Sequence, residues 1–162
     1  MTSSATPVQA VPRPTRLPTS ERLKVDPTFQ AFWLLRIGFT IAPILFGADK
    51  FAHVMTNWDK YLAPEFNDVI PGTAHQAMYA VGVIEIVAGL AVLLLPRFGG
   101  YLVALWLAGI ILNLALIGGY WDIALRDFGL LLAALTLARL ATAFPAGALS
   151  DRLAAALHRT RP

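Results

Sequence analysis

The stretch from Phe98 to Trp121, FGGYLVALWLAGIILNLALIGGYW, contains no charged side chain. A helix rises about 1.5 Å per residue, so about 20 apolar residues cross the ~30 Å hydrocarbon core of a bilayer. The whole chain of 162 residues is 57% hydrophobic and 14% charged, which lies far outside the range of soluble globular domains. The stretch therefore predicts a membrane-spanning helix from Phe98 to Tyr120 in an all-α membrane protein.

Three further apolar segments of similar length flank this helix. Their predicted bounds are Phe29 to His53, Gln76 to Leu95 and Trp121 to Phe144. The second holds one charge, Glu85, whereas the first and last hold several, so a protein with two spans is the alternative. We favour four spans, because removing the charged segments would leave amphipathic helices without a partner.

Short connections predict how these helices pack. The turns at residues 96–100 and 118–122 contain proline or glycine and force the helices on either side to run antiparallel. Between the first two spans, Thr56 to His75 has apolar residues at helical spacing and is interrupted by Pro64. The sequence thus predicts a four-helix antiparallel bundle with a short amphipathic helical segment on one membrane surface.

The two ends of the chain differ from the apolar body, residues 29–144. Residues 1–28 are rich in proline and carry a net charge of +2, so we expect a flexible tail. Residues 145–162 also carry +2, and we expect an amphipathic helix on the inner leaflet. Because positively charged ends face the cytoplasm, both termini are predicted to be cytoplasmic. The Thr56–His75 segment, with a net charge of −2, falls on the other side.

Several classes of chemistry are excluded or find no support. The chain has no cysteine, so disulfides and thiolate metal sites are excluded. The three histidines follow no metal-ligand spacing, and neither a catalytic triad nor a phosphate loop is recognisable. Haem ligation by His53 and His75 is an unfavoured alternative. We predict no catalytic residue, no metal site, no covalently bound cofactor and no nucleic-acid partner.

Charged residues inside the spans are costly in lipid and usually pair or serve function. Counted along each helix, Arg36 and Glu85 lie at similar depths, so we predict an ion pair between the first two spans. Gly82 and Gly89 flank Glu85 and would let the helices approach closely. A structural role and a functional role for this pair both remain open.

A second polar layer is predicted nearer the outer surface. Its members are Asp49, Lys50, His53, Asn113, Arg126 and Asp127. Taken singly, each has an ordinary role, such as an interfacial histidine, a lysine reaching the head groups or interhelical glue for an asparagine. Together, under the Thr56–His75 segment, they predict a polar pocket for the head group of a quinone or a lipid.

Four pieces of sequence resemble the DoxX-like family of small four-helix membrane proteins. They are Arg36, GADKF at residues 47–51, GVIEIVAGL at 82–90, and the pair Arg126-Asp127. The resemblance covers about residues 30–142. The chain departs from the family at residues 138–141, where ARLA replaces a glycine-rich turn leading to Ser-Leu-Asp.

The resemblance implies a bacterial inner-membrane protein associated with redox enzymes. Examples are the DoxD and DoxA type of thiosulfate:quinone oxidoreductase, and complexes with superoxide dismutase and sulfurtransferase. The expected function is a non-catalytic membrane subunit of a quinone-linked redox complex, with protein partners in that complex and the lipid bilayer around it. The alternatives are a carrier or channel for a small solute or protons, relayed by Arg36, Glu85 and Asp127, and a structural or assembly factor.

Overall fold

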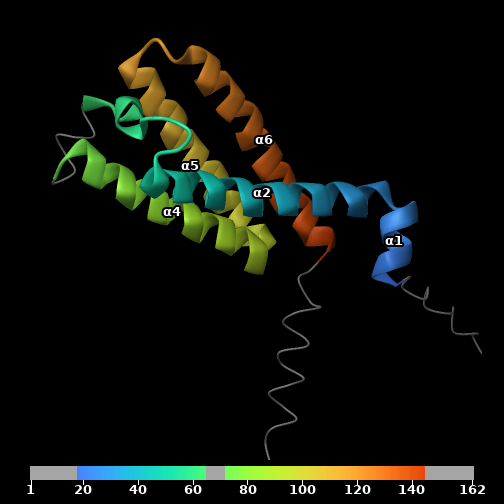
Figure 1. Ribbon diagram of the computed structural model, residues 1–162. Coiled ribbons are helices and arrows are strands. Elements are labelled where there is room, and N and C mark those ends of the chain that lie inside the picture. The colour runs from blue at the N-terminus through green and yellow to red at the C-terminus, as the bar shows by residue number, and fades with distance from the viewer. Residues whose placement is uncertain (1–17, 65–71, 145–162) are drawn as a thin grey trace, which may run out of the picture.

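The computed structural model describes residues 18–64 and 72–144, which form helices and no strand. This part of the chain contains two shorter elements and four long helices, whose arrangement can be followed in Figure 1. They are α1 (Thr19–Val25), α2 (Pro27–Ala52), the 3-10 helix η1 (Trp58–Tyr61), α4 (Ala74–Leu94), α5 (Pro96–Ile117) and α6 (Trp121–Ala143).

The four long helices confirm the predicted segments, whose bounds differ from those observed by at most three residues. Pro96 occupies the first turn of α5, where its missing N–H costs nothing, and the same residue ends α4. The helices α2, α4 and α5 are long and apolar enough to cross a membrane. Helix α6 is less apolar and is not among these candidate spans, because it contains four charged residues, Asp122, Arg126, Asp127 and Arg139.

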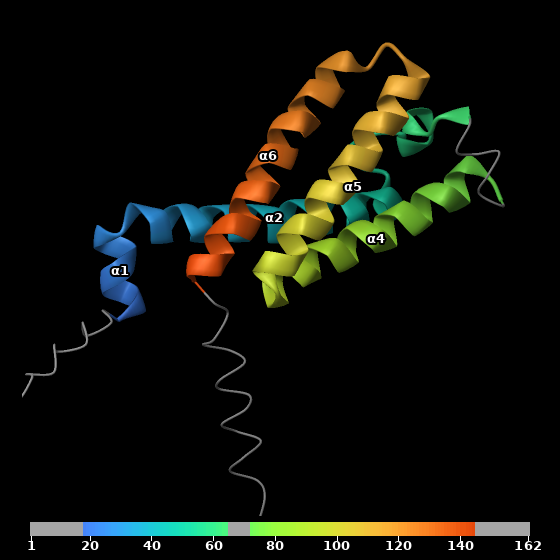
Figure 2. The same cartoon turned by 180° about the vertical axis from the view of Figure 1, so that it is seen from behind.

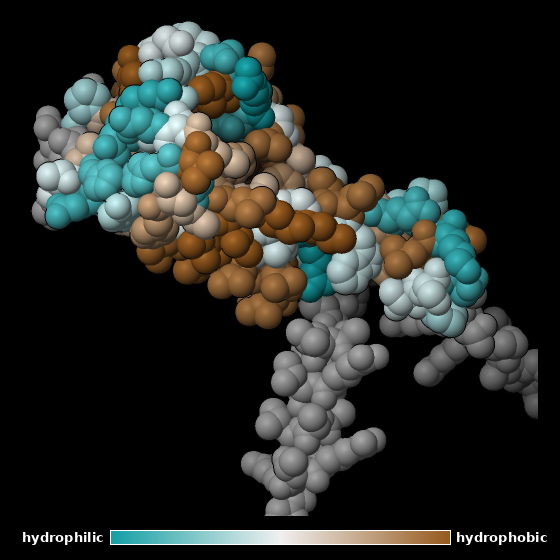
Figure 3. Space-filling model, viewed as in Figure 1, coloured by the Kyte–Doolittle hydropathy of each residue, from teal (hydrophilic) through white to brown (hydrophobic). Residues whose placement is uncertain are grey.

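The outer surface of the long helices is strongly apolar. Leu34 on α2, Leu105 on α5 and Leu125 on α6 are 72–73% exposed. Figure 3 shows this apolar surface between two more polar ends of the molecule. Exposed leucines on this scale are unfavourable in water and natural in lipid. Together with the three long apolar helices, they indicate a protein embedded in a membrane.

The helices pair in chain order, α2 against α4 and α5 against α6, and α4 also contacts α5 (Figures 1 and 2). We call one end of the bundle the lid end. It holds the end of α2, η1, the start of α4 and the turn between α5 and α6. The opposite end, with α1, the turn between α4 and α5 and the end of α6, is the tail end.

Glycines set the distance between α2 and α4. A methyl group at Gly47 would lie 2.5 Å from the carbonyl oxygen of Gly82. One at Gly89 would lie 2.8 Å from the carbonyl oxygen of Thr40. Only residues without a side chain allow such contact between two helix backbones. This confirms the prediction that Gly82 and Gly89 let the first two spans approach closely.

The hydrophobic core occupies the centre and the tail-side half of the bundle. Its most buried side chains are Phe32, Val92, Ala134 and Leu137, each at most 2% exposed. Near the tail end, the rings of Phe29 and Phe32 pack against Phe144 with centroids 5.2 and 5.4 Å away. The lid-side half has few large buried apolar side chains, and this is where charged residues are buried.

Two predictions outside the long helices need correction. A flexible tail through residue 28 is wrong for residues 19–28, because Thr19–Val25 form α1 and Asp26 caps α2. The Asp26 carboxylate accepts the N–H groups of Thr28 and Phe29, and the latter above all holds the pKa of Asp26 below its usual value. In the segment Thr56–His75, the structure shows η1 alone before Pro64, and α4 already includes His75. The remaining predictions for residues 1–17, 65–71 and 145–162 lie outside the described residues.

Candidate functional site

The most unusual feature of the bundle is a buried ion pair between α2 and α4. The Lys50 ammonium nitrogen lies 2.5 Å from a Glu85 carboxylate oxygen, and the two side chains are 4% and 10% exposed. Side chains tilt toward the start of their own helix. Since α2 and α4 run antiparallel, Lys50 leans toward the bundle centre while Glu85 leans toward the lid, and their charged ends meet.

Trp58 of η1 covers this ion pair. We call residues 54–63, which contain η1 and follow the end of α2, the lid. The centroid of its ring lies 4.0 Å from the Lys50 ammonium nitrogen, within the range of a cation–π contact. The indole N–H of Trp58 donates a hydrogen bond of 2.8 Å to Asp49. The Lys50 charge is therefore enclosed by a carboxylate on one side and an aromatic ring on the other.

Asp49 organises the backbone that leads into the lid. Its carboxylate accepts the N–H groups of Val54 and Met55 at 3.0–3.2 Å, in addition to the indole of Trp58. His53 ends α2 in the left-handed conformation, with φ of 54°, which turns the chain back over the helix end. Asp49 thus holds the lid in place, and both of its carboxylate oxygens accept hydrogen bonds from the lid.

Asn113 of α5 fastens the far end of the lid. Its side-chain oxygen accepts the N–H of Ala63 at 2.9 Å, and its side-chain nitrogen donates to the carbonyl of Tyr61 at 2.6 Å. Ala63 is fully buried, so its N–H would find no water if this contact were lost. A polar residue within an apolar helix here ties a loop to the bundle.

We expect Asn113→Ala to loosen the lid without unfolding the bundle. A buried N–H left without a partner costs about 1–3 kcal/mol. Hydrogen exchange at the Ala63 amide should therefore accelerate by roughly 5- to 150-fold. Leu112→Ala, at a neighbouring exposed side chain of α5, is the matched control and should leave this amide unchanged. Equal exchange in both variants would show that Asn113 does not hold the lid.

The other two long helices also contribute to the surroundings of Glu85. Trp106 of α5 has a buried indole nitrogen near the Glu85 carboxylate, without a hydrogen bond of ordinary geometry. Asp127 of α6 is half-buried and within electrostatic range of Glu85. We call Lys50, Glu85, Trp106 and Asp127, together with Asp49 and Trp58, the buried charge cluster. It holds one ammonium group and three carboxyl groups.

The predicted ion pair between Arg36 and Glu85 is wrong. The Arg36 guanidinium donates to the carbonyl of Leu93 near the tail end and lies 5.0 Å from the Trp33 ring centroid. The contacts of Gly47 with Gly82 and of Thr40 with Gly89 place Glu85 almost opposite residue 44. Residue 44 lies eight residues after Arg36 on α2, so at about 1.5 Å per residue Glu85 is about 12 Å nearer the lid end than Arg36. The prediction counted the depth of each residue from the end of its own helix, and this count does not give the register between the two helices.

Two predicted members of the outer pocket lie outside the cluster. Arg126 is exposed and pairs with Asp122 at 3.2 Å, one turn earlier on α6. His53 is exposed and stacks on His75, with ring centroids 5.0 Å apart. Asp49, Lys50 and Asp127 do belong to the cluster, and Asn113 supports its lid.

Sequence reasoning missed the two tryptophans of the cluster. Trp58 stood out only as an apolar residue of an amphipathic segment, and Trp106 as part of an uncharged span. The available signal was the indole N–H, which seeks a partner when it is buried in an apolar helix. Among residues 18–64 and 72–144, no three side chains of the metal-binding types converge.

Comparisons with protein-family models, with curated proteins and with solved structures find no match to this chain.

Proposed function

We propose that the protein is a non-catalytic membrane subunit of a quinone-linked redox complex and that the buried charge cluster binds the quinone head group. The observation that carries this proposal is the Lys50–Glu85 pair, enclosed beneath Trp58 in an otherwise apolar bundle. Burying charged side chains inside a membrane costs free energy, and such residues commonly mark sites of function.

The chemistry of the cluster suits both redox forms of a quinone. The carbonyl oxygens of a quinone accept hydrogen bonds, which the Lys50 ammonium and the Trp106 indole N–H can donate. The hydroxyl groups of a quinol donate hydrogen bonds, which Glu85 and Asp127 can accept. The flat rings of Trp58 and Trp106 offer surfaces for stacking. A head group would reach Lys50 by entering between it and the Trp58 ring, which then stacks on the head group.

The membrane arrangement that we propose has four crossings, with α6 as the fourth. Leu125, Phe128 and Leu132 give α6 an exposed apolar face like those of its neighbours. The tail end carries Arg36, Arg97 and Arg139 without acidic partners among the described residues, which favours a cytoplasmic tail end. The resemblance to the DoxX-like family supports a bacterial inner membrane and partners from redox complexes.

Binding of a short-chain quinone to the purified protein tests the proposal. We expect Lys50→Met combined with Glu85→Leu to weaken binding about 10- to 100-fold, because a hydrogen bond to a charged group contributes about 1.5–3 kcal/mol. Quenching of tryptophan fluorescence reports binding, since Trp58 and Trp106 adjoin the site. Arg36→Gln, which removes a charge outside the cluster, is the matched control.

Equal affinity in the cluster variant and in the Arg36→Gln control would contradict the quinone site. Trp58→Ala provides a second, milder variant, because it changes the lid and leaves the pair of charges in place. It should weaken binding by removing the stacking surface. Unchanged binding after both changes would leave the cluster with a structural role.

A proton carrier is the second candidate, and one observation favours it. The cluster holds three carboxyl groups and one ammonium group, and carboxylates held close to one another in an apolar bundle favour the binding of a proton. In proteoliposomes, a proton flux that disappears in Asp127→Asn and persists in Arg126→Gln would support a carrier. Quinone binding without any flux would support the redox subunit.

A further inference from the structure

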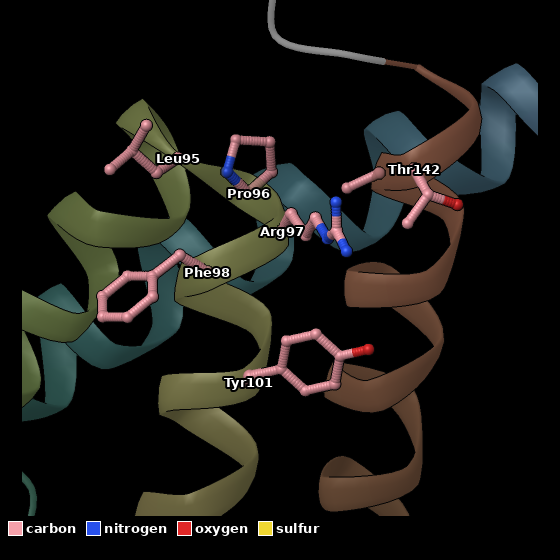
Figure 4. A pocket seen from close by; sticks show the side chains of 7 residues that line it. Leu95, Pro96, Arg97, Phe98, Tyr101 and Thr142 are labelled. Atoms are coloured by element: carbon pink, nitrogen blue, oxygen red, sulfur yellow. The ribbon is translucent and has the colours of Figure 1, made fainter.

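A groove lies at the tail end, remote from the buried charge cluster. It has a volume of about 550 Å³ and runs between the first turns of α5 and the last turn of α6 (Figure 4). The residues that line it are Leu95, Pro96, Arg97, Phe98, Tyr101, Ala141 and Thr142. Gly100 brings the two helices together beside it, since a methyl group there would lie 2.9 Å from the carbonyl oxygen of Ala134.

The groove is apolar along its walls and carries one cation. Figure 4 shows the Arg97 guanidinium and the Tyr101 ring reaching from α5 toward α6. Arg97 is exposed and makes no ion pair with any residue of 18–64 or 72–144. The helix α5 begins without a side-chain cap, and no backbone carbonyl among residues 18–64 and 72–144 accepts the amide N–H groups of Arg97 and Phe98 in its first turn. An acidic group placed here would meet positive charge from two sources.

Charge around the groove is positive as well. Among residues 18–64 and 72–144, the acidic residues at the tail end are Glu21 and Asp26, and these are paired with Lys24 and Arg22. Arg139, three residues before Thr142 on α6, is exposed. The groove opens where α4 ends and α5 begins, which is the level of the lipid head groups if these apolar helices cross the bilayer. An amphiphile with a negative head and an apolar chain would match both the positive charge and the apolar walls of the groove.

We propose that this groove binds an anionic phospholipid. The phosphate lies on the Arg97 guanidinium, and the start of one acyl chain runs along Phe98 and Tyr101 toward the bilayer. Basic pockets between membrane helices at the cytoplasmic side commonly hold such head groups. The lipid site requires only that the protein is embedded in a membrane, so a test of this site does not depend on the quinone site.

Native mass spectrometry of the full-length protein in mixed micelles tests this site, with phosphatidylglycerol and phosphatidylcholine as the probes. We expect one phosphatidylglycerol molecule to be retained in preference to phosphatidylcholine. An arginine near the membrane surface contributes about 1 kcal/mol toward an anionic lipid, so Arg97→Gln should weaken phosphatidylglycerol binding about fivefold. Arg126→Gln, an exposed arginine at the lid end, is the matched control and should bind as the wild type does.

A second variant separates the groove from the charge. Thr142→Phe fills the space between the helices and keeps Arg97, so it should also reduce retention of phosphatidylglycerol. Equal retention of the two lipids by the wild type, or an unchanged preference in Arg97→Gln, would overturn the proposal. Displacement of the lipid by millimolar glycerol phosphate would likewise overturn it, because the groove would then be a site for free anions.

Discussion

Glu85→Ala should lower the free energy of unfolding by about 3–5 kcal/mol, the usual loss when one partner of a buried ion pair is removed. The reason is that Lys50, which is 3% exposed, would keep its charge in a buried position without the carboxylate that contacts it. Trp58 covers that ammonium group and prevents it from reaching water. Unfolding in mixed micelles with increasing dodecyl sulfate measures the loss.

Removing both charges provides the control. A buried ion pair replaced by apolar residues of similar volume often leaves stability unchanged or raises it. Lys50→Met with Glu85→Leu should therefore recover most of what Glu85→Ala loses. If Glu85→Ala and the paired variant were equally unstable, the loss would come from packing at residue 85 instead of the uncompensated charge.

The second large effect concerns the contact between α2 and α4. We expect Gly47→Ala to destabilise the protein by about 1–3 kcal/mol, the range for an overpacked core. The new methyl group would lie 2.5 Å from the carbonyl oxygen of Gly82 and 2.8 Å from the side chain of Ile86. Because a carbonyl group of a helix backbone has little freedom to move away, the two helices would have to separate.

Gly38→Ala is the matched control in the same helix. A methyl group at Gly38 meets no atom within 4 Å, so this change should stabilise α2 by up to about 1 kcal/mol through helix propensity. Thermal unfolding of both variants under identical conditions tests the difference in sign. Equal effects of the two substitutions would show that α2 and α4 do not need close contact at Gly47.

The long helices were predictable because their signals are local. Each predicted span is an apolar run that ends at proline, glycine or a polar stretch, and these breakers act on their own neighbours. Pro96 illustrates this, since one residue fixes both the end of α4 and the start of α5. The short helix α1 was missed because residues 1–28 as a whole are rich in proline, whereas Thr19–Val25 contain none.

Pairing within the site was harder to predict because it depends on register between helices. Arg36 and Lys50 lie about four turns apart on α2, so the register between α2 and α4 decides which of them Glu85 meets, and the apolar composition of the helices does not reveal that register. The sequence did contain the deciding marker, the glycines Gly47 and Gly82, which face each other across the interface. Had Gly47 been matched with Gly82, Lys50 would have become the nearest cation to Glu85.

The ion pair between α2 and α4 also bears on how the chain is made. Glu85 lies near the middle of α4, where an ionised group costs of order 2.5–3.5 kcal/mol during insertion by the translocon. Lys50 on the preceding helix offsets that cost only when both segments are present together. The first two long helices are therefore expected to leave the translocon as a hairpin, with α2 retained until α4 has been synthesised.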